Sequence, residues 1–299
     1  MLTNPIDVFV LGATGFVGEA VVAEALAAGL SVGAWARSEA QAQALRRRGV
    51  IVTAPPQILA AKVVIDLVQP ALPVRLTQSA LAEVARSRVA ITRRILEALP
   101  RDALLFSVSG TDDFERGLIS HRSHFTEHPQ GFGRIGLSVR AELLASKRPF
   151  ASMHLGTVYG PGKAFASTLF PRLAKGKLPV VGDGSNRMPL IHVEDAARAL
   201  VHLAGLSSES LRAHPWILTD GRDTTQRELL ELGARLLHAP PPKAVPRWLA
   251  SIIAGSVAAS SFSRDLPTDP SALLATGFTL KYPSIATGLP YSLARLEAA

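Results

Sequence analysis

The chain of 299 residues contains no cysteine. This absence excludes disulfide bonds, thiolate metal sites and a cysteine nucleophile, and it suits a reducing cytoplasm. The first residues run directly into an apolar, strand-like segment, without the charged leader and cleavage site of a secreted protein. The longest apolar stretch near the end, residues 248–259, is shorter than the roughly 20 residues that cross a bilayer. We therefore expect a soluble, cytoplasmic protein.

Charged residues are few, and most of them are basic. They make up 19% of the chain, against 47% hydrophobic residues, which is typical of a packed globular protein. The net charge of +8 is compatible with nucleic acid or an anionic ligand. The basic residues are scattered, however, and the tightest cluster, residues 46–48, ends an expected helix without aromatic neighbours on which bases could stack. The sequence thus favours a small-molecule substrate over nucleic acid.

Strand-like and helix-like patterns alternate through the first half of the chain. The expected strands are residues 7–12, 31–37, 50–53, 62–68 and 103–109, with a sixth within 150–160, and the expected helices are 16–29, 39–48, 76–99 and 136–146. This alternation predicts a doubly wound α/β fold with a parallel sheet, the Rossmann type. The link between the third and fourth strands is too short for a full helix, so that crossover is expected to be trimmed.

Glycine and proline divide the second half into separate segments. The pattern predicts a strand and helix that return to the sheet at 189–205, a strand within 211–220, a helix capped by Thr224 or Thr225, an apolar helix at Trp248, and a last 35 residues rich in loops. We expect a dinucleotide-binding domain and a smaller, mainly C-terminal, substrate-binding subdomain. The first would comprise residues 1–155 and 190–222, and the second residues 156–189 and 223–299.

Three glycines follow the first expected strand and open a helix. Gly12, Gly15 and Gly18 have G-x-x-G-x-x-G spacing, with Thr14, Phe16 and Val17 between them. Such a turn lets backbone N–H groups approach a pyrophosphate, which the positive end of the helix dipole stabilises. We expect these six residues to bind a dinucleotide cofactor, the alternative being a tight turn that packs without a ligand.

Arg37 and Ser38 stand at the end of the second strand, where an NAD site usually offers an acidic residue to the ribose hydroxyls. A guanidinium can form two parallel bonds with the 2′-phosphate of NADP, and a serine can add a hydroxyl donor. We therefore expect NADP(H) to be preferred over NAD(H). In the alternative interpretation, Arg37 is a solvated charge at a strand end.

Several motifs resemble those of extended short-chain dehydrogenase/reductases of the NAD-dependent epimerase/dehydratase type, over nearly the whole chain. They are GATGFVG at 12–18, FSVSG at 106–110, TVYGPG at 157–162, the long segment 176–200 and TGFTLKYPSIATGL at 276–289. The resemblance implies that the dinucleotide lies across the carboxyl ends of the strands. Further contacts would come from Leu67, Val68, Gln69, Gly156 and Val158. Family members commonly dimerise through two helices, one of them 76–99, so a homodimer is possible, although many arginines on that helix leave a monomer open.

The catalytic residues of this family are largely missing. The resemblance implies a Ser/Thr, a Tyr, a Lys four residues later and a supporting Asn, and these positions fall on Ser109, Arg134, Ser138 and Arg88. Only Ser109 matches, and it can donate a hydrogen bond to a substrate oxygen. Arg134 keeps its proton at ordinary pH and is a poor general acid, but its guanidinium can bind an oxyanion. Ser138 cannot replace the charge of a lysine.

Another group would then have to supply the proton. The loop before Arg134 holds His124, along with His121, Glu127 and His128, and histidine titrates near neutral pH. Loop histidines can equally be solvated. Asp112 and Asp113 are further candidates, unless they only form a turn. In the resemblance Tyr159 is mostly structural and Asp195 caps a helix.

Three hypotheses follow. The first is an NADP(H)-dependent reductase of the atypical extended type, acting on a carbonyl or hydroxyl of a small metabolite, with Ser109 and Arg134 orienting the oxygen. The small number of polar groups around Trp248 and Phe262 favours a lipophilic substrate. The second is a non-redox isomerase, dehydratase or cyclase that keeps the cofactor bound. The third is a catalytically silent NADP-binding sensor or assembly protein. No hypothesis includes a metal.

Overall fold

A computed structural model describes residues 6–73, 75–162 and 170–297 of the chain. A seven-stranded parallel sheet forms its centre, in the order β10-β6-β5-β4-β1-β2-β3. The strands are β1 (Ile6–Leu11), β2 (Val32–Trp35), β3 (Ile51–Thr53), β4 (Ala61–Asp66), β5 (Leu104–Gly110), β6 (Phe150–Leu155) and β10 (Trp216–Leu218).

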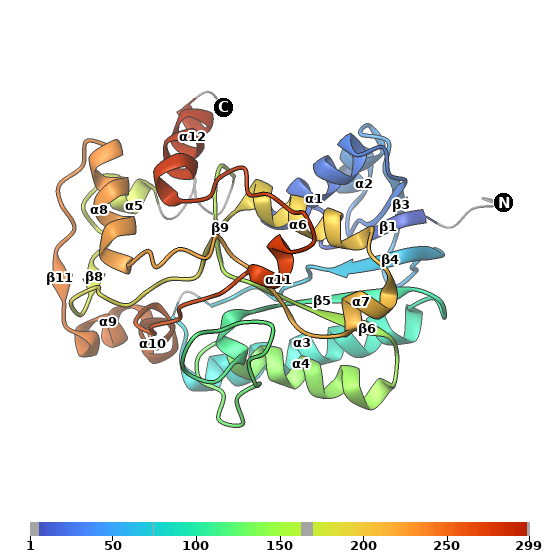
Figure 1. Ribbon diagram of the computed structural model, residues 1–299, viewed down its shortest axis with the longest axis horizontal. Helices are drawn as coiled ribbons and strands as arrows, with labels where there is room; N and C mark the ends of the chain where they lie inside the picture. The colour runs from blue at the N-terminus through green and yellow to red at the C-terminus, as the bar shows by residue number, and fades with distance from the viewer. Residues whose placement is uncertain (1–5, 74, 163–169, 298–299) are drawn as a thin grey trace.

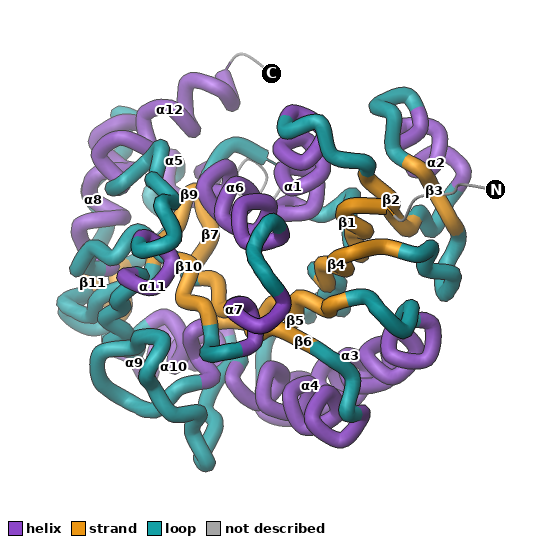
Figure 2. The backbone as a smooth tube through the Cα atoms, turned by 45° about the vertical axis from the view of Figure 1, so that its right-hand side comes forward, coloured by secondary structure: helices purple, strands orange, loops and turns teal. Residues whose placement is uncertain are grey.

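Helices cover both faces of the sheet (Figure 1). One face carries α1 (Phe16–Ala27), α2 (Glu39–Arg46) and α6 (Val193–Ala204), and the other carries α3 (Gln78–Ala98) and α4 (Gly133–Ser146). Figure 2 shows the same two layers from the side, with the sheet between them. The predicted doubly wound α/β fold is confirmed, and so is the trimmed crossover, because no helix lies between β3 and β4.

The alternation of side chains along β1 builds the core on both faces. Val8 and Val10 belong to the cluster under α1 and α6, whereas Phe9 and Leu11 belong to the cluster under α3 and α4. Successive side chains of a strand point to opposite faces, so a strand covered on both sides must be apolar throughout. Gly33 of β2 makes room for one of these side chains, since a Cβ atom there would lie 2.9 Å from the Phe9 ring atom Cε2.

One predicted strand does not join the main sheet. β9 (Leu190–His192) was expected to return to it, but it pairs with β7 (Thr157–Tyr159) in a separate two-stranded sheet. The chain leaves the main sheet at Gly156, whose N–H donates to the carbonyl of Leu218, and the N–H of Thr157 then donates to the carbonyl of Pro189. The strand predicted within 211–220 does join the sheet as β10, after the short helix α7 (Ser208–Arg212).

Most of the remaining elements gather at one end of the molecule (Figure 1). They are α5 (Phe170–Ala174), β8 (Val180–Val181), α8 (Gln226–Leu236), β11 (Ala244–Val245), α9 (Arg247–Ala254), α10 (Ser256–Phe262) and α12 (Ile285–Glu297). The short helix α11 (Ser271–Leu274) instead packs on the main sheet, where Leu273 joins the core with residues of β10. Thr225, not Thr224, caps α8 and forms a capping box with Glu228. Within the described ranges, no helix is both long and apolar enough to cross a membrane.

The expectation of loops at the C-terminus is wrong for α12. The helix holds Pro290 in its interior, a residue that usually ends or kinks a helix. Tertiary packing outweighs this preference, because Ile285, Leu289 and Leu293 are all buried in one cluster with Tyr159. Burying large aliphatic side chains stabilises by roughly 1.5–3 kcal/mol each, which is comparable with the penalty for an interior proline.

Candidate functional site

The turn between β1 and α1 is packed so closely that it requires glycine. Gly12 has a φ of 83°, and a Cβ atom there would lie 2.8 Å from the carbonyl oxygen of Leu67. At Gly18 a Cβ atom would overlap the backbone of Gly12. Gly15 is the N-cap of α1 and has no side chain with which to cap it. The start of α1 therefore presents its positive dipole end at a turn of bare backbone, which fits a pyrophosphate.

The loop after β4 lies beside this turn. The N–H of Leu67 donates to the carbonyl of Leu11, and the Leu67 carbonyl faces Gly12. Val68 and Gln69 continue the loop at the carboxyl end of the sheet, where Gln69 is exposed. Gly156 directly follows β6, and Val158 is the middle residue of β7. Most of the predicted cofactor residues thus follow the carboxyl ends of strands of the main sheet or begin the helix after β1.

Arg37 and Ser38 follow β2 and precede α2. The Arg37 side chain is exposed, and within the described residues no acidic group pairs with its guanidinium. Ser38 is the N-cap of α2, with its Oγ accepting from the N–H of Gln41 at 3.4 Å. A hydroxyl that accepts from a backbone amide still has its own proton to donate. The pair thus offers a cation and a hydroxyl donor next to the start of a second helix.

A buried ion pair beneath loop 67–69 was not predicted from the sequence. Asp66, the last residue of β4, accepts a hydrogen bond of 2.6 Å from Nη2 of Arg88, and both side chains are 2% exposed. Arg88 also donates to Thr92, and the other Asp66 oxygen accepts from the N–H of Val68. A signal existed, because Arg88 falls on the buried face of α3, in register with Leu81 and Val84. The pair fixes the loop 67–69 against α3.

Ser109 lies near the end of β5, next to helix α4. A Cβ atom on Gly136 would overlap both the Ser109 hydroxyl and the carboxylate of Asp113. Asp113 belongs to the 3-10 turn Thr111–Asp113 that follows β5, and it is buried. The absence of a side chain at Gly136 thus allows α4 to approach until Ser109 and Asp113 lie together against its backbone.

Asp113 is also paired on its other side. Its Oδ2 lies 3.3 Å from Nδ1 of His154, and both side chains are almost fully buried. Nδ1 of His154 is also 3.1 Å from the carbonyl oxygen of Gly110. Two acceptors around one ring nitrogen require a proton there, so Nδ1 is the donor. Ser109 and His154 are neighbours in the β5–β6 ladder, and this register brings the three side chains into one region.

Asp112 joins the same turn to the C-terminal part of the chain. Its carboxylate accepts from Nη1 of Arg264 at 2.7 Å, from Ser261 at 3.3 Å and from the N–H of Phe132 at 3.3 Å. Burial raises the pKa of Asp112, and Arg264 opposes that rise. Asp112 therefore acts as a clamp between the start of α4 and the end of α10, whereas Asp113 faces Ser109.

Arg134 and Ser138 lie one turn apart on α4, as the spacing predicts. Arg134 is exposed, and its Nε donates to the carbonyl of Pro129 at 3.3 Å. Ser138 donates from Oγ to the carbonyl of Arg134 at 2.7 Å, so its hydroxyl proton is held by the helix backbone. Arg134 also lines a hollow of about 370 Å³ with Glu127, His128 and neighbours from the preceding loop.

The histidines of that loop separate in the structure. His128 is exposed and lies in the hollow beside Arg134. His124 is exposed too but does not line this hollow. His121 lies against His214, with ring centroids 5.1 Å apart, and accepts from Arg122. Of these histidines, His128 shares the hollow with Arg134, and the predicted His124 does not.

Tyr159 and Asp195, from the motif segments 157–162 and 176–200, both contact the segment that leads into α12. Tyr159 is fully buried and donates to the carbonyl of Ser284 at 3.2 Å, and burial raises its pKa well above the usual value. Asp195 does not cap α6, because His192 is the N-cap. Instead its carboxylate accepts from the N–H groups of Lys281 and Tyr282 and from Arg198. Asp195 therefore anchors the segment that leads into α12.

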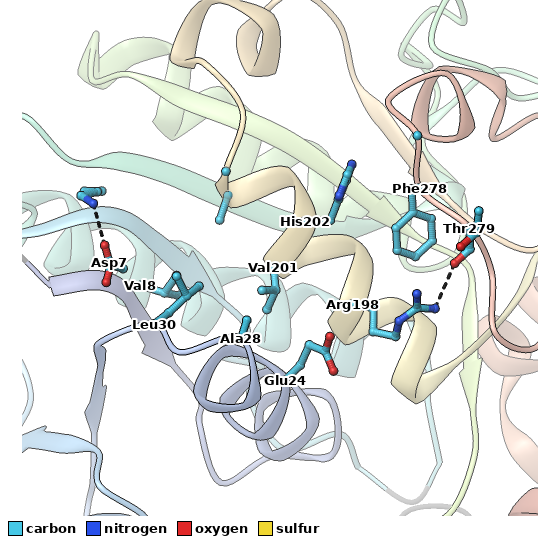
Figure 3. A pocket seen from close by; sticks show the side chains of 14 residues that line it. Asp7, Val8, Glu24, Ala28, Leu30, Arg198, Val201, His202, Phe278 and Thr279 are labelled. Atoms are coloured by element: carbon cyan, nitrogen blue, oxygen red, sulfur yellow. Dashed lines mark hydrogen bonds and ion pairs between the residues drawn. The ribbon is translucent and has the colours of Figure 1, made fainter.

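A larger hollow, of about 480 Å³, lies at the opposite ends of the strands (Figure 3). It lies between the last turns of α1 and α6, with Phe278 on the far side. Its cations are already paired, since Lys62 donates to Asp7 and Arg198 to the carbonyl of Thr279. None of the predicted site residues lines this hollow, so we place the candidate site at the carboxyl ends of the strands. Among the residues described, no cluster of three His, Asp or Glu side chains fits a metal ion.

The parallel sheet and the glycine turn after β1 define a Rossmann-type α/β protein. The model of the NAD dependent epimerase/dehydratase family matches residues 8–129 and 134–214. The chain therefore belongs to this family.

Three proteins of known activity or structure are similar to the chain. A 3-diazoavenalumate denitrifying reductase of a Streptomyces species is 29% identical over 284 residues, covering 83% of this chain and 87% of that one. The human epimerase family protein SDR39U1, solved with NADPH, matches with a TM-score of 0.78 at 20% identity, over 97% of this chain and 99% of the other. The UDP-glucose 4-epimerase of Thermus thermophilus, solved with NAD, gives a TM-score of 0.69 at 18% identity, over 98% and 100%.

Proposed function

We propose that the protein is an NADP(H)-dependent oxidoreductase that acts on the carbonyl or hydroxyl group of a small, lipophilic metabolite. The observation that carries this proposal is the pairing of the closely packed glycine turn with Arg37, an exposed guanidinium that no described acidic residue neutralises. Two similar proteins support it, one named as a reductase and one solved with NADPH. The cofactor would lie against the residues predicted above, from Gly12 to Gly18 and at 37–38, 67–69, 156 and 158.

The substrate would bind between the sheet and the C-terminal part of the chain, residues 156–189 and 223–299. When bound, the dinucleotide supplies or accepts a hydride. The Ser109 hydroxyl donates a hydrogen bond to the substrate oxygen and so polarises the carbonyl. Arg134 stabilises negative charge on that oxygen, because its guanidinium stays protonated. The proton then comes from water or from a histidine of the loop before α4, where His128 lies beside Arg134.

A second candidate function is favoured by the state of the lysine position. Ser138 uses its hydroxyl proton within the helix and carries no charge. The lysine that would lower the pKa of a neighbouring proton donor is missing. This face of α4 therefore holds no group suited to supply the proton that accompanies hydride transfer. A non-redox isomerase, dehydratase or cyclase needs no hydride transfer; it would use the oxyanion contact that Arg134 provides, and the proton that it moves would pass to and from water or a loop histidine such as His128. A catalytically silent NADP-binding protein would need neither a proton donor nor an oxyanion contact.

Binding and turnover separate these functions. Protein fluorescence titrated with NADPH and with NADH tests the cofactor, and we expect tighter binding of NADPH. Loss of NADPH absorbance is then followed with a panel of ketones, aldehydes and enones, for the native protein and for Arg134→Ala. Turnover that falls in Arg134→Ala supports the reductase. Binding of NADPH without turnover of any compound favours the non-redox enzyme or the catalytically silent protein, and equal or absent binding of both dinucleotides contradicts the cofactor assignment.

A further inference from the structure

The carboxylate of Asp113 lies beside the hydroxyl of Ser109, the residue that alone matches the catalytic positions of the family. Both groups border the space next to Gly136, where one added Cβ atom would overlap them. Among the described residues, neither the Ser109 hydroxyl nor Oδ1 of Asp113 forms a hydrogen bond with any third group. A hydroxyl and a carboxylate oxygen in this arrangement are suited to exchange a proton.

The two groups differ in how far they are buried. Ser109 is half-buried near the carboxyl end of β5, where the candidate site lies. Asp113 is 2% exposed, on the 3-10 turn that follows this strand. Asp113 is thus too deeply buried to touch a substrate directly, and it can act on one only through Ser109.

His154 holds the other oxygen of Asp113. Its Nδ1 lies 3.3 Å from Oδ2 and carries a proton, because the carbonyl oxygen of Gly110 is also within 3.1 Å. Nε2, on the other side of the ring, is buried without a partner among the described residues, and the ring of Phe114 packs against the imidazole with centroids 4.6 Å apart. A proton on Asp113 therefore finds no acceptor beyond the imidazole, and its route leads to Ser109.

Arg140 provides positive charge near Asp113. It follows Gly136 by one turn of α4, and its Cζ lies 3.8 Å from the centroid of the Phe125 ring. Burial lowers the pKa of Arg140, and the negative charge of Asp113 opposes this effect. Arg140 and the Nδ1–H of His154 thus stabilise the carboxylate that remains when Asp113 gives up a proton.

The neighbouring carboxylate, Asp112, has other partners. It accepts hydrogen bonds from Arg264 and Ser261 of the C-terminal part of the chain and from the N–H of Phe132. Of the two carboxylates on this turn, Asp113 is therefore the one that is available to Ser109.

We propose that Asp113 holds the proton of the proposed oxidoreduction and exchanges it with the substrate through Ser109. This inference rests on the proposed function and names the group that takes the place of the missing tyrosine. During reduction the carbonyl carbon gains a hydride from the reduced dinucleotide, and the carbonyl oxygen takes the hydroxyl proton of Ser109. Ser109 takes the proton of the Asp113 carboxyl group in turn. After the product has left, the carboxylate regains a proton from water through Ser109, and oxidation of an alcohol reverses these steps.

A double-mutant cycle tests whether the two residues act as one unit. The carbonyl compound that is reduced fastest in the panel described above serves as the substrate. Asp113→Asn and Ser109→Ala should each lower kcat at least about 100-fold, while the KM for NADPH stays within about twofold. The double variant should lose no more than either single variant, because each substitution interrupts the same proton path.

Glu115→Gln is the matched control, because Glu115 is an exposed carboxylate just after the same turn. It should keep the kcat of the native protein. Thermal unfolding and fluorescence titration with NADPH establish that each variant is folded and binds the dinucleotide.

The pH dependence of reduction provides a second measurement, which does not require the Asp113→Asn variant to fold. The charged and titratable groups around Asp113 are Asp112 on the same turn, His154 on β6 and Arg140 on α4. Reduction consumes the proton of Asp113, so kcat should rise as the pH falls, over the range in which the protein stays folded. Ser109→Ala separates Asp113 from the substrate and should remove this dependence, whereas titration of Asp112 or His154 would affect both proteins alike.

The outcomes separate this inference from the proposed function. Losses that multiply in the double variant would overturn the inference alone, and so would a native kcat in folded Asp113→Asn or a pH dependence that survives Ser109→Ala. Absence of turnover by the native protein with every compound of the panel would overturn the proposed function and this inference together.

Discussion

Gly136 of α4 lies directly against the hydroxyl of Ser109 and the carboxylate of Asp113. These residues come from a helix, a strand and a turn, and their contact sets how closely α4 approaches the carboxyl end of β5. The absence of a side chain at position 136 thus allows α4 to pack against Ser109 and Asp113.

Gly136→Ala should push α4 away from β5. Overpacking of a closely packed contact typically costs about 1–3 kcal/mol of the free energy of unfolding, and we expect a loss of this size. Urea unfolding measures it. Gly110→Ala is the matched control, because the nearest atoms to a Cβ there lie 4.0 Å away and its φ of −111° suits alanine. Equal losses in the two variants would contradict the role given to Gly136.

Arg88→Met should destabilise the protein strongly. It leaves the carboxylate of Asp66 buried without its partner, a change that typically costs about 3–5 kcal/mol. Arg93→Met on the same helix breaks an exposed ion pair with Glu142 and should cause no comparable loss. Chemical unfolding of both variants provides the comparison. A loss as small for Arg88→Met as for Arg93→Met would show that the buried pair contributes little.

Arg37→Ala should weaken NADPH binding and leave NADH binding unchanged. Hydrogen bonds between charged groups contribute about 1.5–3 kcal/mol, which corresponds to a roughly 10- to 100-fold loss of affinity. Fluorescence titration with each dinucleotide measures it. Arg47→Ala, an exposed arginine at the end of α2, serves as the control. If both dinucleotides lose affinity equally, Arg37 does not read the 2′-phosphate.

Asp220→Asn should change how stability depends on pH. Burial raises the pKa of Asp220 to about 7, its Oδ2 has no partner within the described residues, and the unfolded value is 3.8. Above pH 7 both states are ionised, and the folded state bears the cost of a buried charge. As the pH falls from 7 towards 3.8 the folded protein takes up a proton first, so the native protein gains stability.

The variant lacks this charge, and at about pH 8 it should be more stable than the native protein, by up to roughly 4 kcal/mol. The difference should shrink as the pH falls towards 4. Urea unfolding at several pH values measures it, with exposed Asp223→Asn as the control. Burial lowers the pKa of His192 to about 4, but this affects both proteins alike and cancels in the comparison. A constant difference across the range would contradict the raised pKa.

Local patterns were sufficient for most of the sheet domain. Buried parallel strands are apolar throughout, and the glycines of the turn after β1 are required by backbone geometry alone, so neighbouring residues carry the information. The prediction failed for β9 and α12. The strand pattern of β9 was predicted correctly, but β9 pairs with β7, because the chain leaves the main sheet directly after β6. In α12 the burial of Ile285, Leu289 and Leu293 outweighs an interior proline.

The candidate site divides in the same way. Helical periodicity predicted that Arg134 and Ser138 share one helix face. The location of Arg37 was predicted from its place directly after the second strand. Sequence spacing could not reveal that the Ser138 hydroxyl donates a hydrogen bond to the carbonyl of Arg134, or that His128 rather than His124 lines the hollow with Arg134. Those facts depend on the path of a loop.

The sequence by itself determined the alternating elements, the parallel sheet and the glycine turn, because each depends on residues a few positions apart. Only the tertiary structure decided that Asp66 meets Arg88, that Asp112 meets Arg264, and that Gly136 meets Ser109 and Asp113. Such contacts join segments separated by 22 residues for the first pair and 152 for the second. These contacts depend on how helices pack across a sheet, which cannot be predicted from the local propensities of neighbouring residues.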